Sequence, residues 1–196
     1  MNDIKTIDAL YEALCLNGVQ TVADLEKEYD RIADALINNF GIQKGDKLYR
    51  FVEIEFYHTI ADKSEGIECV TYFRVADALR YFFHKSGMDI TFLSSEERYG
   101  GILIRAIRCG EEFINGPHLV VDALFDQFAA QHLPSDNYPL IVPVETEAKV
   151  SPVPSWRYHI TVSDKQYRYT LPISEWKDHK NYSAFPWDYK GYLRKK

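Results

Sequence analysis

Cysteine and long apolar runs are scarce in this chain of 196 residues. Its three cysteines, Cys15, Cys69 and Cys109, lie far apart and form no CxxC pair. Neither a disulfide framework nor a cysteine-based zinc site is therefore expected, and each thiol is interpreted as buried and unreactive. No apolar run approaches the roughly 18 residues that would suggest a membrane span, so we expect no membrane partner.

Other recognisable signals are also missing. The first residues lack the basic and then apolar layout of a secretory signal, which favours a cytoplasmic location. No Walker A or G-x-G-x-x-G loop is present, and the histidines show no metal-ligand spacing. We therefore expect neither a cofactor nor a bound metal ion.

Positive charge is scarce over most of the chain and concentrated at its end. The net charge is −6, which does not indicate a nucleic-acid-binding protein. Residues 1–153 carry 14 Lys and Arg against 25 Asp and Glu, a net of −11, whereas residues 154–196 carry 9 against 4, a net of +5, and hold 10 of the 28 aromatic residues. This segment predicts either a docking surface for a polyanion or a protein partner, or a tail whose rings are buried against the body.

Aromatic residues, by contrast, are abundant at 14%, and 46% of the residues are hydrophobic. This composition argues against disorder and favours one globular domain spanning residues 1–196. We divide it into a helical part (1–45), a sheet-rich body (46–171) and a basic aromatic tail (172–196). Helices followed by a mainly antiparallel sheet predict an α+β fold.

Local patterns support this division. Apolar residues recur at helical spacing through the first forty residues, with a break at Asn17-Gly18, a helix cap at Thr21 and an exit marked by Gly41 and Gly45. The later patterns predict a strand at 48–57, a hairpin that turns at 84–87, a strand at 102–107, a helix from Gly116-Pro117, a strand at 140–144 and a hairpin of 156–162 with 166–171.

Three charged residues stand inside predicted apolar strands. Glu53 and Glu55 share one face of a strand because they are two residues apart, and Arg105 interrupts the apolar run at 102–107. If only the two carboxylates are considered, an exposed polar face of the strand would explain them. A carboxylate and a guanidinium on buried strands are better explained if they pair or face a cleft, where the carboxylate is a candidate general base.

Four segments, in this order, resemble the alkyladenine (3-methyladenine) DNA glycosylase family. Residues 52–57, VEIEFY, resemble the family's V-E-T-E-A-Y strand, and residues 83–88, FHKSGM, resemble its Y-x-x-Y-G-M hairpin. Residues 100–107, GGILIRAI, resemble its G-x-x-V-L-L-R-A-L strand, and Asn115-Gly116-Pro117 resembles its (N/S)-G-P helix start. The resemblance covers about residues 30–130.

The resemblance implies a base-excision repair hydrolase that acts on damaged double-stranded DNA. Such enzymes flip a base into an aromatic pocket, where a carboxylate activates the water that cleaves the N-glycosidic bond. Glu55 takes the position of the general base, and Tyr57 and Phe83 take the two base-stacking positions. Arg105 takes the position of the arginine that contacts the backbone near the flipped nucleotide. Neither a metal nor a cofactor is implied.

The sequence also departs from the family pattern. Ser86 stands where the family has the tyrosine that wedges into the minor groove, and Leu93 stands near the position of an asparagine that rejects normal purines. Beside Ser86, Lys85 is a candidate phosphate contact, although polar residues are the norm in turns. Two alternatives therefore remain: a relative of this fold that acts on another nucleic-acid lesion or on a small nucleoside, and a catalytically silent relative that binds nucleic acid or protein, in part through the tail.

Overall fold

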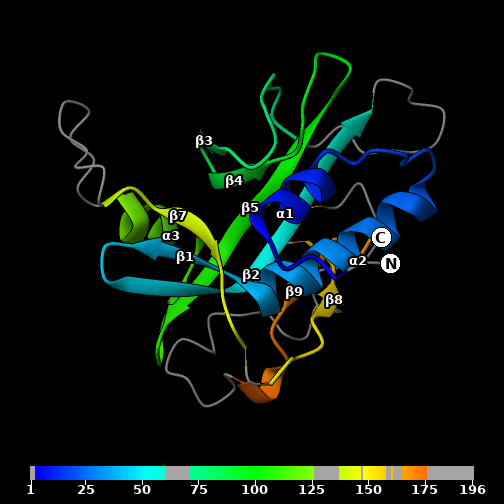
Figure 1. Ribbon diagram of the computed structural model, residues 1–196. Helices are drawn as coiled ribbons and strands as arrows, with labels where there is room; N and C mark the ends of the chain where they lie inside the picture. The colour runs from blue at the N-terminus through cyan, green and yellow to red at the C-terminus, as the bar shows by residue number, and fades with distance from the viewer. Residues whose placement is uncertain are drawn as a thin grey trace, which may run out of the picture.

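The computed structural model describes residues 3–60, 71–125, 137–146, 148–157, 160 and 165–175 (Figure 1). Its elements follow one another as α1 (Ile7–Leu14), α2 (Val22–Asn39), β1 (Phe40–Lys44), β2 (Lys47–Ile60), β3 (Tyr81–His84), β4 (Gly87–Thr91), β5 (Arg98–Cys109), β6 (Glu112–Asn115), α3 (Pro117–Phe125), β7 (Leu140–Pro143), β8 (Val153–Ser155), β9 (Arg168–Thr170) and a final 3-10 turn (Ile173–Glu175). Helices and a mainly antiparallel sheet are both present, so the expected α+β class is confirmed.

The strands form one curled sheet in the order β3-β4-β5-β2-β1-β7, and every strand pair in it is antiparallel. The remaining strands join at the side: β6 pairs with β5, β9 with β2, and β8 with β9. The long strand β2 therefore has neighbours on both edges, with β5 on one and β1 followed by β9 on the other.

The two N-terminal helices begin at threonine caps. Thr6 accepts a hydrogen bond from the amide of Ala9, and Thr21 forms a capping box with Asp24, as the sequence indicated. Such caps satisfy amide groups that the first helical turn cannot pair internally. The expected end of the helical part was wrong, however, because residues 40–44 form strand β1.

Strand β1 follows α2 without a loop and turns back on β2 at Gly45, whose φ of +57° suits glycine. Gly41 lies so close to β2 that a Cβ there would come within 2.8 Å of the carbonyl oxygen of Tyr49. A glycine read as a helix terminator is therefore a strand residue selected for close backbone packing.

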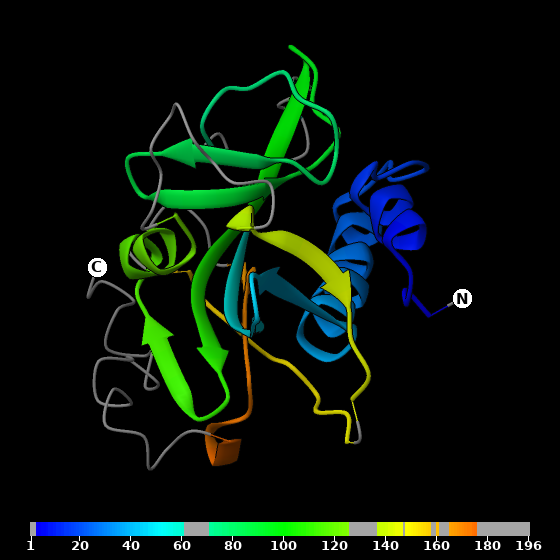
Figure 2. The same ribbon diagram turned by 60° about the vertical axis from the view of Figure 1, so that its left-hand side comes forward.

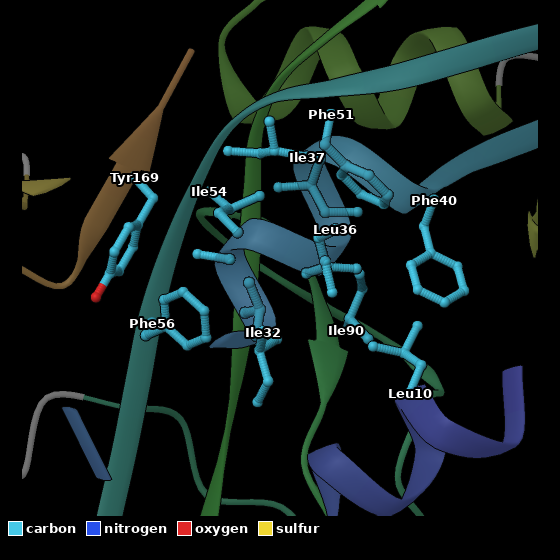
Figure 3. Close-up of a cluster of buried hydrophobic side chains, with 14 of the residues drawn as sticks. Leu10, Ile32, Leu36, Ile37, Phe40, Phe51, Ile54, Phe56, Ile90 and Tyr169 are labelled. Carbon is cyan, nitrogen blue, oxygen red and sulfur yellow. The ribbon is translucent and has the colours of Figure 1, made fainter. Parts of the chain in front are cut away.

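Helices α1 and α2 cover one side of the sheet, and α3 lies on the other side (Figure 2). Figure 3 shows the main core, where side chains of α2 such as Ile32 and Leu36 meet Ile54 and Phe56 of β2. Tyr29 of α2 stacks on Phe56 with ring centroids 4.3 Å apart. Since side chains alternate along a strand, Glu53, Glu55 and Tyr57 must point to the opposite side, which we call the polar face.

The hairpin of β3 and β4 forms as predicted, with Lys85 and Ser86 in its turn. The second predicted hairpin differs, because β9 pairs with Val153–Ser155 on one edge and with β2 on the other. Residues 158–159 and 161–164 lie outside the described part of the chain, as do residues 176–196 of the tail. Within the described ranges, no helix is both long and apolar enough to cross a membrane.

Candidate functional site

The carboxylates of β2 are buried on the polar face. Glu53 has 1% of its surface exposed and Glu55 has none. The interpretation as an exposed polar face is thus wrong. Burying two ionised carboxylates is costly unless cations or hydrogen-bond donors compensate them, so the site is defined by their partners.

Arg105 of β5 is the first of these partners. The register between β2 and β5 is irregular here and skips Val52 on one strand and Arg105 on the other. Bulges of this kind re-aim a side chain and are common next to active sites. The Nε of Arg105 donates to Oε1 of Glu53 over 2.9 Å, and Nη1 donates to Oε2 of Glu55 over 3.4 Å. The carboxylate and the arginine thus pair, as the sequence indicated.

Arg168 of β9 is the second partner, which the sequence did not reveal. Only 2% of its surface is exposed, and its Nε lies 2.5 Å from the same Oε1 of Glu53. Burial raises the pKa of Glu53, while the guanidinium groups of Arg168 and Arg105 act in the opposite direction. Burial alone would lower the pKa of Arg105, but the carboxylates of Glu55 and Glu53 outweigh burial and raise it.

Tyr57 covers Glu55. Its hydroxyl donates to Oε2 of Glu55 over 2.6 Å, and the guanidinium carbon of Arg157 lies 4.9 Å from the centre of its ring. Burial and then the charge of Glu55 raise the pKa of Tyr57 well above its ordinary value. The phenol therefore keeps its proton and remains a hydrogen-bond donor to the carboxylate.

A cavity of about 450 Å³ opens beside this cluster. It lies on the polar face between β2, the β3–β4 hairpin and the start of α3. Its walls include Tyr57, Thr71, Tyr72, His84, Lys85, Ser86, Asp89, Leu103, Arg105, Pro117, His118 and Ile160. A cavity of this size, with a few convergent polar groups, is typical of small-molecule sites.

A buried ion pair organises the part of the wall that the β3–β4 hairpin forms. Asp89 accepts from Nη1 of Arg74 over 2.6 Å and lies 2.9 Å from Nε2 of His84. The amide of Ser86 donates to Nδ1 of His84, so the proton of the neutral imidazole is assigned to Nε2, which donates to Asp89. The ring of Tyr72 stacks on His84 at 4.5 Å, and this wall offers an aromatic surface to a ligand.

The structure brings most of the predicted site residues together. Tyr57, Arg105, Ser86 and Lys85 all line the cavity, and Glu55 lies directly behind Tyr57. The Oγ of Ser86 lies 3.1 Å from the hydroxyl of Tyr72, and Lys85 is exposed at the hairpin tip.

Phe83 is the exception, since it does not line the cavity. Alternation along β3 turns the side chain of Phe83 away from that of His84, which does line the cavity. The ring of Phe83 is 48% exposed and packs edge-on against Phe125. The other rings of the cavity wall belong to His84 and Tyr72. The sequence offered His84 only as a candidate phosphate contact in the hairpin turn, and it did not distinguish Tyr72 from ordinary loop residues. Leu93 does not line the cavity either.

No group of three or more His, Cys, Asp or Glu side chains is arranged to hold a metal ion in the described ranges. No protein-family model matches the chain, and no curated protein matches it either. The function must therefore be inferred from the residues of the site themselves.

Proposed function

We propose that this protein takes a single base of damaged double-stranded DNA into the cavity and hydrolyses its N-glycosidic bond. One observation carries the proposal: a fully buried carboxylate, Glu55, is held by Tyr57 and Arg105, and both of these side chains line the cavity. A ligand in the cavity thus lies one side chain away from a candidate general base.

The walls of the cavity suit a flat, nitrogen-containing ligand. Tyr57 and the stacked rings of Tyr72 and His84 all line the cavity, and every nucleobase offers a face to such rings. Lys85 and His118 stand at the rim, where a backbone phosphate of an extruded nucleotide would lie. These features favour a base extruded from a DNA strand as the ligand, rather than a purely aliphatic molecule.

The reaction needs one rearrangement. The hydroxyl of Tyr57 gives up its place on Oε2 of Glu55 to a water molecule, and Glu55 removes a proton from that water. The water oxygen attacks C1′ of the sugar, and the electron pair of the N-glycosidic bond leaves with the base. The base takes up a proton from solvent, and Glu55 returns its proton to solvent before the next turnover. Arg105 stays beside the carboxylate and compensates its charge while it is ionised.

A catalytically silent binding protein is the second candidate. The observation that favours it is the complete burial of Glu55, which is not part of the cavity wall. In that case the cavity binds a base without cleaving it, and the basic aromatic tail (172–196) adds affinity for nucleic acid or for a protein partner. Only residues 172–175 of this tail belong to the described part of the chain.

The test is release of free base from duplex DNA that has been methylated or deaminated. We expect wild-type protein to release base, Glu55→Gln to release none while still binding the duplex, and Glu111→Gln, at an exposed carboxylate of the β5–β6 turn, to behave as wild type. Wild-type binding without release would favour the silent protein. If the wild-type protein neither releases base nor binds the duplex, both candidates are contradicted.

A further inference from the structure

Glu53 lies between two arginines in a row of charged side chains. Its Oε1 accepts from Nε of Arg105 over 2.9 Å and from Nε of Arg168 over 2.5 Å. These residues come from β5, β2 and β9, three strands that lie side by side. The row continues from Arg105 to Glu55 and ends at the hydroxyl of Tyr57.

The two contacts of Arg105 are unequal. Its Nε lies 2.9 Å from Glu53, whereas its Nη1 lies 3.4 Å from Glu55, which is long for a charge-assisted hydrogen bond. The nearer carboxylate thus fixes the plane of the guanidinium. Of the two arginines, only Arg105 lines the cavity, and Arg168 is enclosed behind it.

The observed contacts of Arg105 differ from the simplest pairing of an arginine with a carboxylate. An arginine beside a single carboxylate prefers a bidentate pair with two parallel hydrogen bonds. If Arg105 paired in this way with Glu55, it would take one acceptor site on each carboxylate oxygen and leave fewer sites for water. The contact with Glu53 draws the guanidinium away from that geometry, and Arg168 compensates the remaining charge of Glu53.

We propose that Glu53 and Arg168 are positioning residues that hold Arg105 at the cavity wall and keep it from closing onto Glu55. Neither residue touches the cavity, so neither acts on a ligand directly. The effect on catalysis rests on the function proposed above, but the effect on Arg105 itself does not.

The position of Arg105 can be followed by NMR of the ¹⁵N-labelled full chain. In the wild type, the Nε–H groups of Arg105 and Arg168 should give downfield, slowly exchanging signals because both are buried and bonded to a carboxylate. The Nε–H of Arg74, which donates to the carbonyl oxygen of Tyr72 over 3.1 Å, is an internal reference.

In Glu53→Gln, we expect the signal of Arg105 Nε–H to lose its downfield shift. A new, slowly rotating Nη–H signal of Arg105 should appear, and it should vanish in the double variant Glu53→Gln/Glu55→Gln. The signal of Arg74 should not move. An Nε–H signal of Arg105 that is unchanged, or the absence of any signal that depends on Glu55, would overturn the proposal.

The activity test uses Arg168, because its side chain lies outside the cavity. In Arg168→Gln, we expect kcat for base release, per folded molecule, to fall about 10-fold or more because the reacting groups are misplaced. KM should change less than about 3-fold because the ligand site is intact. Arg168→Lys should restore most of the rate. A wild-type kcat per folded molecule in Arg168→Gln would contradict the positioning role. If the wild type itself releases no base, the proposed function fails, and the NMR result alone decides the position of Arg105.

Discussion

The hydroxyl of Tyr57, a residue that lines the cavity, lies 2.6 Å from Oε2 of Glu55, a buried residue that does not. This hydrogen bond, together with the contacts of Arg105, links the buried charges to the ligand site. It also means that the phenol contributes to stability and, under the proposed mechanism, must move during each turnover.

Removing this hydroxyl should destabilise the fold. We expect Tyr57→Phe to lower the free energy of unfolding by about 1.5–3 kcal/mol, because a buried carboxylate loses a donor. Unfolding in urea, followed by circular dichroism, measures the change. Tyr81→Phe is the matched control, since the hydroxyl of Tyr81 is buried without a hydrogen-bond partner in the described part of the chain. Its loss should be neutral or slightly stabilising, and equal losses for both variants would contradict the assignment.

The ion pair of Arg74 and Asp89 should be a major determinant of the cavity wall. Their side chains are 1% and 3% exposed, and breaking such a buried pair by Arg74→Met should cost about 3–5 kcal/mol. The exposed pair of Arg80 and Asp77, 4.0 Å apart, serves for comparison, and Arg80→Met should change stability by no more than about 0.5 kcal/mol. Thermal unfolding of both variants checks the difference. A small loss in Arg74→Met would show that the wall does not depend on this pair.

His58 should make the protein less stable in acid. Burial, followed by the charge of Arg98, lowers the pKa of His58 to about 3, while the unfolded chain titrates near its ordinary value of 6.5. As the pH falls below 6.5, His58 binds a proton in the unfolded state but not in the folded state, so the unfolded state is favoured. This residue alone should remove about 2 kcal/mol of stability between pH 7 and pH 5.

Replacing His58 by Phe isolates this contribution. The new ring can keep the edge-on contact with Phe92, where the centroids are now 5.6 Å apart. Urea unfolding at pH 7 and pH 5 should show a loss smaller by about 2 kcal/mol in His58→Phe than in the wild type. His118→Gln, at an exposed histidine, should keep the wild-type loss. The same loss in His58→Phe as in the wild type would contradict the prediction.

The aromatic wall can be tested through binding. In the background of Glu55→Gln, Tyr72→Ala should weaken binding of a fluorescent methylated duplex about 10-fold, because base stacking on a ring contributes roughly 1–3 kcal/mol. Phe83→Ala should leave the affinity unchanged, since Phe83 lies outside the cavity. Fluorescence anisotropy measures both. A larger loss in Phe83→Ala than in Tyr72→Ala would restore Phe83 as the second stacking residue.

The sequence predicted those parts of the site that carry a local anomaly. Glu55 and Arg105 are charged residues within apolar strands, and burial makes such residues conspicuous. The cap at Thr21 and the turn at Lys85 and Ser86 depend only on nearby residues, so they too were predictable.

The missed parts depend on contacts between distant segments. Arg168 meets Glu53 across 115 residues of sequence, and charged residues of an alternating strand ordinarily face solvent. Arg74 and Tyr72 lie in a segment without regular structure, and only the folded hairpin shows that they meet Asp89 and His84. Gly41 resembled a helix terminator because its reason, the closeness of Tyr49, lies on another strand.

The cavity has one wall on a central strand and the other on a hairpin at the end of the sheet. Glu53 and Glu55 have strand partners on both edges, whereas β3 is paired only with β4 in the described part of the chain. Amide hydrogen exchange should therefore be slowest along residues 53–55 and much faster along residues 81–84, since terminal strands open without unfolding the whole sheet. The carboxylates proposed for catalysis thus lie on a strand that we expect to open least often. The ligand can enter when the hairpin of β3 and β4 opens locally.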